Sequence, residues 1–252
     1  MGDDRGDDAG ERDTDAGERD TDPGARLRAA EGRMPALIVG ERLCLDFANT
    51  VEPRGGPDHG ADPPSREYLT GYGDLVAWAA RVGVLDEEGA VRFLGEAGCR
   101  PAAARAVFAR AIALREAIYR AFWAVGQGQA PRPDDLGVLT REHRAATDHA
   151  ALVAAEDGFA WAWTGDGDDE GALDRPLWPV ATSATALLTA GELGRVKVCP
   201  GAPGEVVPCA WLFYDESRNR TRRWCSMADC GSAAKARQLT ARRRTRRAEG
   251  RM

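Results

Sequence analysis

Four of the six cysteines lie in the last quarter of the chain, at Cys199, Cys209, Cys225 and Cys230. Nine residues lie between Cys199 and Cys209, fifteen between Cys209 and Cys225, and four between Cys225 and Cys230. Two thiol pairs held close together can supply the tetrahedral ligands of zinc, and zinc can stabilise a short segment that has little hydrophobic core. The cysteines therefore predict bound Zn²⁺. Because all four ligands are thiols, we expect a closed structural site and not a catalytic one.

A run of cations follows these cysteines. From Lys235 to Arg247 there are seven Lys or Arg and no acid. Residues 195–252 hold 14 basic and 5 acidic side chains, whereas residues 34–194 hold 14 and 24. Because the body is acidic and the C-terminal end is basic, a polyanion is attracted to the C-terminal end first. The run predicts nucleic-acid binding, and a solvated, frayed tail is the alternative.

The rest of the sequence favours a cytoplasmic protein. The N-terminus is charged, and no stretch approaches the roughly 18 apolar residues that cross a bilayer. In a reducing compartment, clustered thiols bind metal in preference to forming disulfides. The isolated Cys44 and Cys99 read as small buried hydrophobic residues. We expect no membrane partner.

Composition divides the chain into three parts. Residues 1–33 are highly charged and contain a seven-residue repeat, which predicts a disordered tail. Met34 begins a more protein-like sequence and is a candidate start site. Residues 34–194 are long enough for a core of their own, and residues 195–252 hold the cysteines and cations. We expect an α+β protein with a mostly helical body, a few strands and a C-terminal metal module.

Hydrophobic periodicity predicts the elements of the body. Helices are expected over 74–82 with Asp74 as cap, from Asp86 onward, and over 102–125, 134–146 and 176–190. Residues 37–39 and 43–47 read as a hairpin or as a strand entering a turn. Asp157-Gly158 predicts a second hairpin over 152–163. Loops are expected over 52–65 and 164–171.

The region around the cysteines has its own pattern. Residues 210–215 read as an aromatic strand that is followed by a turn. Ser226 and Asp229 have the spacing of a capping box, so a helix should begin beside Cys225 and hold Cys230 in its first turn. The helix N-terminus also favours thiolates. One pair on a strand–loop knuckle and the other at a helix start is the layout of a treble-clef zinc finger.

These residues carry a resemblance to known families. The stretch from Cys209 to Gly231, with Trp-Leu-Phe-Tyr-Asp, Ser-Arg-Asn-Arg and Arg-Arg-Trp-Cys in it, resembles the CGNR zinc-finger family. Residues 43–50 (Leu-Cys-Leu-Asp-Phe-Ala-Asn-Thr) and 74–78 (Asp-Leu-Val-Ala-Trp) are similar to the ABATE domain that precedes this finger. The likeness covers roughly residues 36–245. It implies a transcription regulator with a sensor-like domain and a DNA-binding finger whose zinc ligands are Cys199, Cys209, Cys225 and Cys230.

Two features depart from the family pattern. Ser232 and Ala233 stand where the family has Asn and Arg, so the contact of that arginine, to nucleic acid or within the finger, is expected to be weakened or redirected. The insert from Pro200 to Pro208 is longer than the family's short knuckle. It still allows one shared metal, because the cost of closing a loop grows only logarithmically with its length.

Several residues outside the cysteines are candidate contacts. Those for nucleic acid are Arg220, Arg222, Arg223, Lys235, Arg237, Gln238, Arg242, Arg243 and Arg246. The cations would contact phosphates, and Gln238 is the amide that could reach a base edge. In the body, Asp46 and Asn49 either line a ligand pocket or satisfy backbone groups at a strand end. Arg115 either recognises an anionic ligand or faces solvent.

The leading hypothesis is a DNA-binding transcription regulator whose body senses a small molecule. The alternatives are a zinc-stabilised module for protein or RNA, and a thiol redox sensor that releases zinc on oxidation. The sequence contains no phosphate loop, nucleophile elbow or zinc-hydrolase helix, so we expect no enzyme. The ligand, the DNA sequence and the oligomeric state do not follow from these patterns.

Overall fold

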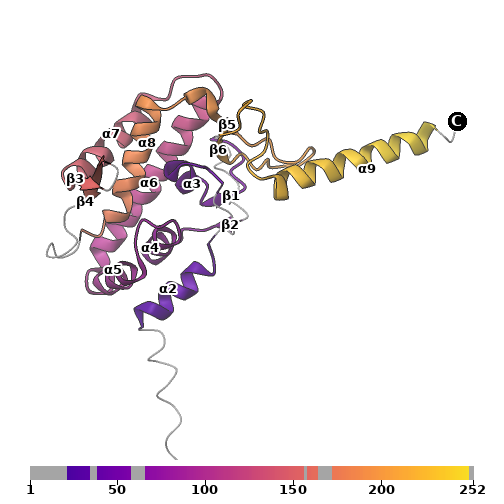
Figure 1. Ribbon diagram of the computed structural model, residues 1–252. Coiled ribbons are helices and arrows are strands. Elements are labelled where there is room, and N and C mark those ends of the chain that lie inside the picture. The colour runs from indigo at the N-terminus through magenta and orange to yellow at the C-terminus, as the bar shows by residue number, and fades with distance from the viewer. Residues whose placement is uncertain (1–21, 35–38, 58–65, 156–157, 164–171, 250–252) are drawn as a thin grey trace, which may run out of the picture.

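Helices make up most of the structure, and the strands form three antiparallel pairs among the described residues (Figure 1). This computed structural model describes residues 22–34, 39–57, 66–155, 158–163 and 172–249, with side chains up to residue 243. The predicted α+β class with a mainly helical body is confirmed. None of the helices in the described part is both long enough and apolar enough to span a bilayer.

The body is built around one long helix, α6 (Pro101–Gly126). Its buried apolar side chains recur at helical spacing, at Val107, Ala111, Leu114, Ile118 and Phe122. The helices that contact it are α3 (Leu43–Ala48), α4 (Tyr72–Arg81), α5 (Glu87–Cys99) and α7 (Pro133–Thr147). A further helix, α8 (Trp178–Ala190), follows one 3₁₀ turn, η1 (Arg175–Leu177), and packs on α3 and α7. The three longest predicted helices are therefore confirmed.

Two short strand pairs accompany these helices. β3 (Ala150–Ala155) and β4 (Gly158–Trp163) form the predicted hairpin, in which Leu152 lies opposite Trp161. β1 (Val51–Glu52) pairs with β2 (Arg66–Glu67) at the two ends of the predicted loop. Residues 58–65 of that loop, and the loop predicted over 164–171, lie outside the described residues.

The segment 43–47, which we expected in a hairpin or where a strand enters a turn, forms the helix α3 instead. Its run of buried apolar residues ends at Ala48 and is too short for periodicity to separate helix from strand. The chain before it approaches closely, since a Cβ at Gly40 would lie 2.7 Å from the backbone nitrogen of Asp46. Most of the other half of the predicted hairpin, over 37–39, lies outside the described residues.

Part of the N-terminal segment that we predicted to be disordered is also helical. α2 (Pro23–Glu31) begins after Asp22, whose carboxylate accepts two hydrogen bonds from backbone amides of the first turn. Leu27 and Ala30 are buried where α2 packs on α4 and α5. The prediction is wrong here because two apolar residues one turn apart suffice for docking in an otherwise polar segment. Residues 1–21 lie outside the described residues.

The two aspartates predicted as helix caps differ. The carboxylate of Asp86 accepts from the amide of Gly89 at 2.8 Å and caps α5, as predicted. Asp74 lies inside the first turn of α4, which begins after Gly71. Its carboxylate accepts from the amide and the hydroxyl of Thr70. The helix is confirmed, and its predicted cap is wrong.

A short sheet joins the C-terminal segment to the body. β5 (Val196–Val198) pairs with β6 (Leu212–Tyr214), and both strands contact α6. Leu212 and Tyr214 belong to the same buried core as the helices of the body. The packing of the body and the packing of the C-terminal segment therefore depend on each other.

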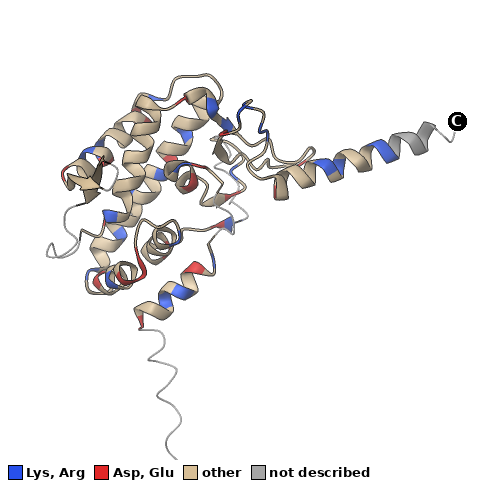
Figure 2. Ribbon diagram, in the orientation of Figure 1, with Lys and Arg blue, Asp and Glu red and all other residues tan. Residues whose placement is uncertain are grey.

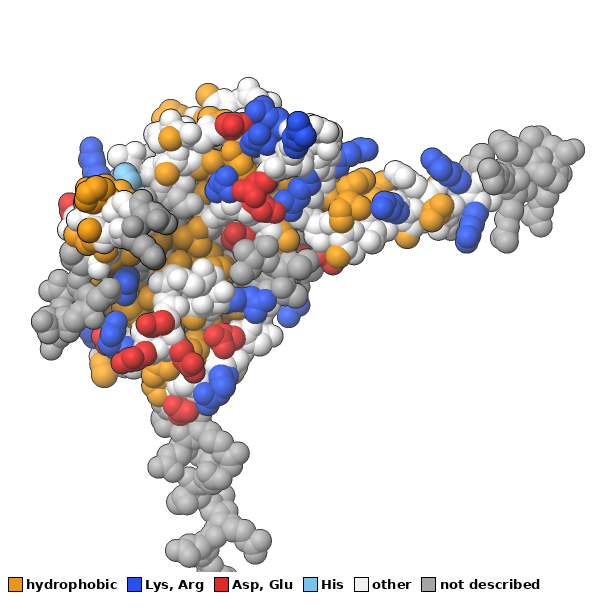
Figure 3. Space-filling model, viewed as in Figure 1, with side chains coloured by type: hydrophobic (Ala, Val, Ile, Leu, Met, Phe, Trp, Pro, Cys, Tyr) orange, Lys and Arg blue, Asp and Glu red, His pale blue; other side chains and the backbone are white. Residues whose placement is uncertain are grey.

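The last helix, α9 (Ser232–Glu249), projects away from the rest of the molecule (Figure 1). It contacts mainly the preceding turn, η3 (Met227–Gly231). Cations are distributed along it, as Figures 2 and 3 show. Its side chains from Lys235 to Arg243 are exposed. Most of this part of the helix is therefore open to a partner.

Candidate functional site

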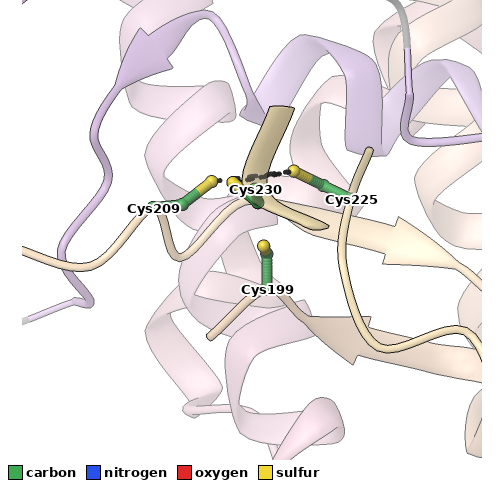
Figure 4. Close-up of side chains that lie close together, drawn as sticks. All are labelled: Cys199, Cys209, Cys225 and Cys230. Atoms are coloured by element: carbon green, nitrogen blue, oxygen red, sulfur yellow. Dashed lines mark hydrogen bonds between the residues drawn. The ribbon is translucent and has the colours of Figure 1, made fainter. Parts of the chain in front are cut away.

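Four sulfur atoms meet where the C-terminal segment joins the body (Figure 4). They belong to Cys199, Cys209, Cys225 and Cys230, and all lie within 4.8 Å of one another. The Sγ of Cys225 is 3.7 Å from that of Cys209 and 3.8 Å from that of Cys230. Zn–S bonds of about 2.3 Å in a tetrahedron place the sulfurs about 3.8 Å apart, whereas a disulfide needs about 2 Å. The spacing fits one zinc ion.

The first cysteine pair is held at one end of the β5–β6 sheet. Cys199 directly follows β5, and its amide donates to the carbonyl of Trp211 at 2.8 Å. The amide of Ala210 donates to the carbonyl of Cys199 at 3.1 Å. Ala210 has a φ of 55°, a left-handed conformation that turns the chain between Cys209 and β6. These contacts make the knuckle that carries both sulfurs.

The insert of residues 200–208 is fastened on two sides. The guanidinium of Arg237 in α9 donates to the carbonyl of Pro203 at 2.7 Å. On the body side, the amide of Gly55 donates to the carbonyl of Pro208 at 3.2 Å, and the amide of Arg54 donates to the carbonyl of the adjoining Cys209 at 2.8 Å. The long insert therefore links the body, a metal ligand and the start of the basic helix.

The second cysteine pair lies where a helix begins. The hydroxyl of Ser226 accepts from the amide of Asp229 at 3.3 Å, as the capping-box spacing predicted. The turn η3 is a π-turn, in which the amide of Gly231 donates to the carbonyl of Ser226 at 3.0 Å. A π-turn is wider than an α-turn and is frequent at functional sites. It accommodates the four residues between Cys225 and Cys230 and brings both sulfurs to one centre (Figure 4).

The electrostatics of the cluster favour a bound cation. Hydrogen bonds from the other three thiols favour a thiolate at Cys199 and lower the pKa of this sulfur. Hydrogen bonding to that thiolate raises the pKa of Cys209 and of Cys225, because a second thiolate would lie against the first. A dication bound among the sulfurs would remove this repulsion. The buried apolar neighbours that limit access of water are Val39, Trp211 and Phe213.

A buried carboxylate, Asp215, organises the turn between β6 and the second cysteine pair. It accepts from the Nζ of Lys197 at 2.5 Å, from the hydroxyl of Ser217 at 2.5 Å and from the amide of Arg222 at 3.0 Å. Burial acts to raise the pKa of Asp215, but the hydrogen bonds from Lys197 and Ser217 outweigh it and lower the pKa to about 2. The polar residues after the aromatic strand therefore have a structural role.

Replacing this carboxylate, in Asp215→Asn, is expected to lower the free energy of unfolding by about 2 kcal/mol at pH 7. The folded pKa lies below the unfolded value of about 4, so the stabilisation is complete above about pH 5 and is lost as the pH falls towards 2. Denaturant unfolding followed by tryptophan fluorescence measures the difference. Glu216→Gln, at the exposed neighbour, is the matched control and should change much less. Equal stability of the parent and Asp215→Asn would contradict this role.

Comparison with protein families gives two matches along the chain. Residues 41–191 match ABATE, described as "Putative stress-induced transcription regulator". The chain belongs to the ABATE family. Residues 195–243 match the CGNR zinc finger, so the resemblance to both families is confirmed. The four clustered cysteines lie within the residues that match the CGNR finger, and they are positioned to bind a metal ion. No curated protein matches the chain.

The CGNR finger exposes several of the residues predicted to contact nucleic acid. Four of them lie on α9 with exposed side chains, namely Lys235, Gln238, Arg242 and Arg243. Arg223 is also exposed, and its guanidinium lies 5.2 Å from the ring centre of Trp224. The side chain of Arg246 lies outside the described side chains. Contact of these residues with nucleic acid stays a prediction.

Arg222, in contrast, is engaged inside the protein. Its guanidinium donates to Glu41 at 2.6 Å, to the carbonyl of Val39 at 3.2 Å and to the carbonyl of Cys225. It also lies 4.7 Å from the ring centre of Phe213. These contacts tie the finger to the segment before α3 and argue against Arg222 as a DNA contact. The sequence shows that Arg222 lies near the cysteines, but it does not show that the ring of Phe213 and the carbonyls of Val39 and Cys225 hold this side chain.

Two more predicted contacts have partners at the surface. Arg220 pairs with Glu192 at 2.6 Å, and Arg237 lies 3.7 Å from Glu205. About half of each arginine side chain is exposed. Exposed ion pairs are weak, so a phosphate could replace either acid. Both arginines remain candidates.

Two candidate ligand contacts of the ABATE domain, Asp46 and Asn49, satisfy backbone groups. The side-chain amide nitrogen of Asn49 donates to the carbonyl of Leu212 at 2.8 Å. Its side-chain oxygen accepts from the backbone N–H of Leu212 at 2.9 Å. The carboxylate of Asp46 accepts from the amide of Gly40 at 2.6 Å. Burial outweighs this hydrogen bond and raises the pKa of Asp46 to about 6. Of the two interpretations left open by the sequence, the structure favours backbone satisfaction.

The third, Arg115, is buried and does not face solvent. Its guanidinium donates to both carboxylate oxygens of Glu67, at 2.6 and 2.8 Å, and to Glu116 at 2.9 Å. Glu116 also accepts from the buried Arg54 at 2.8 Å, and Arg54 lies over the ring of Tyr119. The two arginines and two glutamates balance one another. This network therefore serves the fold, because its cations already have carboxylate partners.

The two remaining cysteines behave differently from each other. Cys44 is fully buried in α3, as predicted, and burial raises its pKa to about 12. Cys99 is exposed at the end of α5, contrary to the prediction. It lies outside the four-sulfur cluster and can serve as a control position.

Proposed function

We propose that this ABATE protein is a transcription regulator that binds one zinc ion through its four clustered cysteines and contacts duplex DNA through α9 and the adjoining surface of the finger. The observation that carries the proposal is a cationic helix that projects from the molecule and begins at the sulfur cluster (Figure 4). A helix of this kind has the dimensions to enter the major groove. Bound zinc would fix its direction.

The charge of α9 supports this role. Lys235 and Arg242 are seven residues apart and therefore lie on the same side of the helix. Side chains of this kind supply affinity through phosphates, and Gln238 is the neighbouring exposed amide that could read a base. Residues 34–194 hold 24 acids against 14 basic side chains, so the body would be repelled by DNA. The protein would thus approach DNA with its C-terminal end, as a binding protein and not as an enzyme.

The test is binding of the zinc-loaded full chain to a labelled DNA duplex over a range of salt concentrations. Each phosphate contact contributes about −0.9 to the slope of log K against log salt. Replacing Lys235, Arg242 and Arg243 together with Gln should make the slope shallower by about 2.7 and weaken binding about a hundredfold at physiological salt. The melting temperature should not change, because all three side chains are exposed.

The matched control removes the same charge from the ABATE domain. Arg92, Arg132 and Arg144 are exposed there, and their joint replacement with Gln should leave the salt slope unchanged. An equal loss in both triple variants would indicate attraction to the net charge and not a binding surface. Tighter binding to RNA than to duplex DNA, or no binding at low salt, would contradict the proposal.

A further inference from the structure

A cavity separate from the sulfur cluster lies between α2, α4, α5 and α6 of the ABATE domain. Its volume is about 830 Å³, which falls within the range of about 300–1,000 Å³ that is typical of small-molecule sites. Tyr72, Leu94 and Phe108 contribute apolar wall, and small residues such as Gly98 leave room between the helices. The cavity therefore has the size and lining of a ligand site.

The charged side chains that line the cavity are all arginines, namely Arg26, Arg33 and Arg105. Arg33 pairs with Asp74 at 2.6 Å. Arg26 and Arg105 are exposed, and within the described part of the chain neither makes an ion pair with an acid. The first turn of α4 also lines the cavity through Tyr72 and Gly73, whose amides have no acceptor within the helix. The cavity is thus locally positive in a domain that has an excess of acids.

We propose that this cavity binds a small amphipathic organic acid. Its anionic group would lie beside Arg26 and Arg105, and its hydrocarbon or aromatic part against Leu94 and Phe108. An inorganic anion would leave the apolar wall in contact with water, and a neutral hydrocarbon would leave the two arginines without a partner. The lining therefore selects for both properties in one molecule.

The position of α2 links this cavity to the finger along the chain. A few residues after α2, Val39 packs in the apolar cluster that contains Cys199 and Cys225. Glu41 then pairs with Arg222 of the finger at 2.6 Å. A molecule held against α2 would act on the segment that the finger packs against. The ligand site itself does not depend on DNA binding, so it can be tested alone.

The test uses two fluorescent probes that share the same rings. One is the anion 1-anilinonaphthalene-8-sulfonate, and the other is N-phenyl-1-naphthylamine, which lacks the sulfonate. The zinc-loaded full chain should bind one equivalent of the anion, at least about tenfold more tightly than the neutral probe. Arg26→Gln combined with Arg105→Gln should weaken binding of the anion about tenfold and leave binding of the neutral probe unchanged.

A second variant tests the location of the probes. Gly98 lines the cavity, and a Cβ added there meets no atom within 4 Å, so Gly98→Phe should fill space without a clash and weaken both probes. Arg144→Gln, at an exposed position on α7, should affect neither. Thermal melting of each variant shows that it is folded.

The exposed face of the β3–β4 hairpin is the competing site for such probes. Leu152, Phe159 and Trp161 are more than half exposed there. Probe binding that survives the cavity variants and falls with Trp161→Ser would overturn the proposal. Equal affinity for the two probes, or the lack of saturable binding of the anion, would overturn it as well.

Discussion

Removing zinc with a chelator is expected to unfold the finger and destabilise the whole chain. Structural zinc contributes about 10–16 kcal/mol to isolated fingers at neutral pH, which is comparable to the total stability of a domain, about 5–15 kcal/mol. Because Leu212 and Tyr214 of β6 belong to the core of the ABATE domain, loss of β6 would uncover apolar surface on α3 and α6. The melting temperature should fall by at least about 10 °C.

Circular dichroism melts with and without chelator measure this effect, and one equivalent of zinc should restore the original melting temperature. Cys225→Ser should reproduce the effect of the chelator. Cys99→Ser is the matched control, because Cys99 is exposed and outside the cluster. If the chelated chain melted like the zinc-loaded chain, the finger would contribute nothing to the stability of the body.

Asn49→Ala is expected to lower the free energy of unfolding by about 2–6 kcal/mol. The buried side chain of Asn49 bonds both the N–H and the carbonyl of Leu212, in a strand that is 163 residues away in sequence. Alanine would leave two buried backbone groups without partners, at a cost of about 1–3 kcal/mol each. Urea unfolding of the zinc-loaded chain gives the difference.

The control for Asn49→Ala removes the side-chain amide of another asparagine, one on the surface of the finger. Asn219 is exposed in the turn after β6, so Asn219→Ala should change stability little. The Asn49→Ala chain should also give up its zinc more readily to a competing chelator, because Cys209 lies three residues before Leu212. If the two alanine variants were equally stable, the proposed link between domain and finger would be wrong.

The sequence predicts the long elements of the fold well and the short ones poorly. α6 and α7 have enough turns for apolar residues to repeat at helical spacing. α3 is only six residues long and buried on most sides, so its apolar run reads equally as a strand. α2 docks through two apolar side chains in a segment whose composition is otherwise polar. In both cases tertiary contacts decide the conformation.

The residues of the candidate site also divide into those that the sequence predicts and those that it does not. The four cysteines stand out by residue type and spacing, and the structure brings their sulfurs together. The roles of Asn49 and Arg222 depend on partners more than a hundred residues away in sequence, and no local pattern reveals them. Polar residues in buried segments are the available signal: Asn49 closes an apolar run, and Asp215 follows the aromatic strand directly.

The metal content of the purified full chain tests the central claim most directly. Inductively coupled plasma mass spectrometry should find one zinc per chain, and Cys209→Ser combined with Cys225→Ser should remove it. Cobalt bound in its place should give the thiolate charge-transfer bands of a tetrahedral four-sulfur site. A parent chain that carries no stoichiometric zinc, or a double variant that keeps its zinc, would contradict the account.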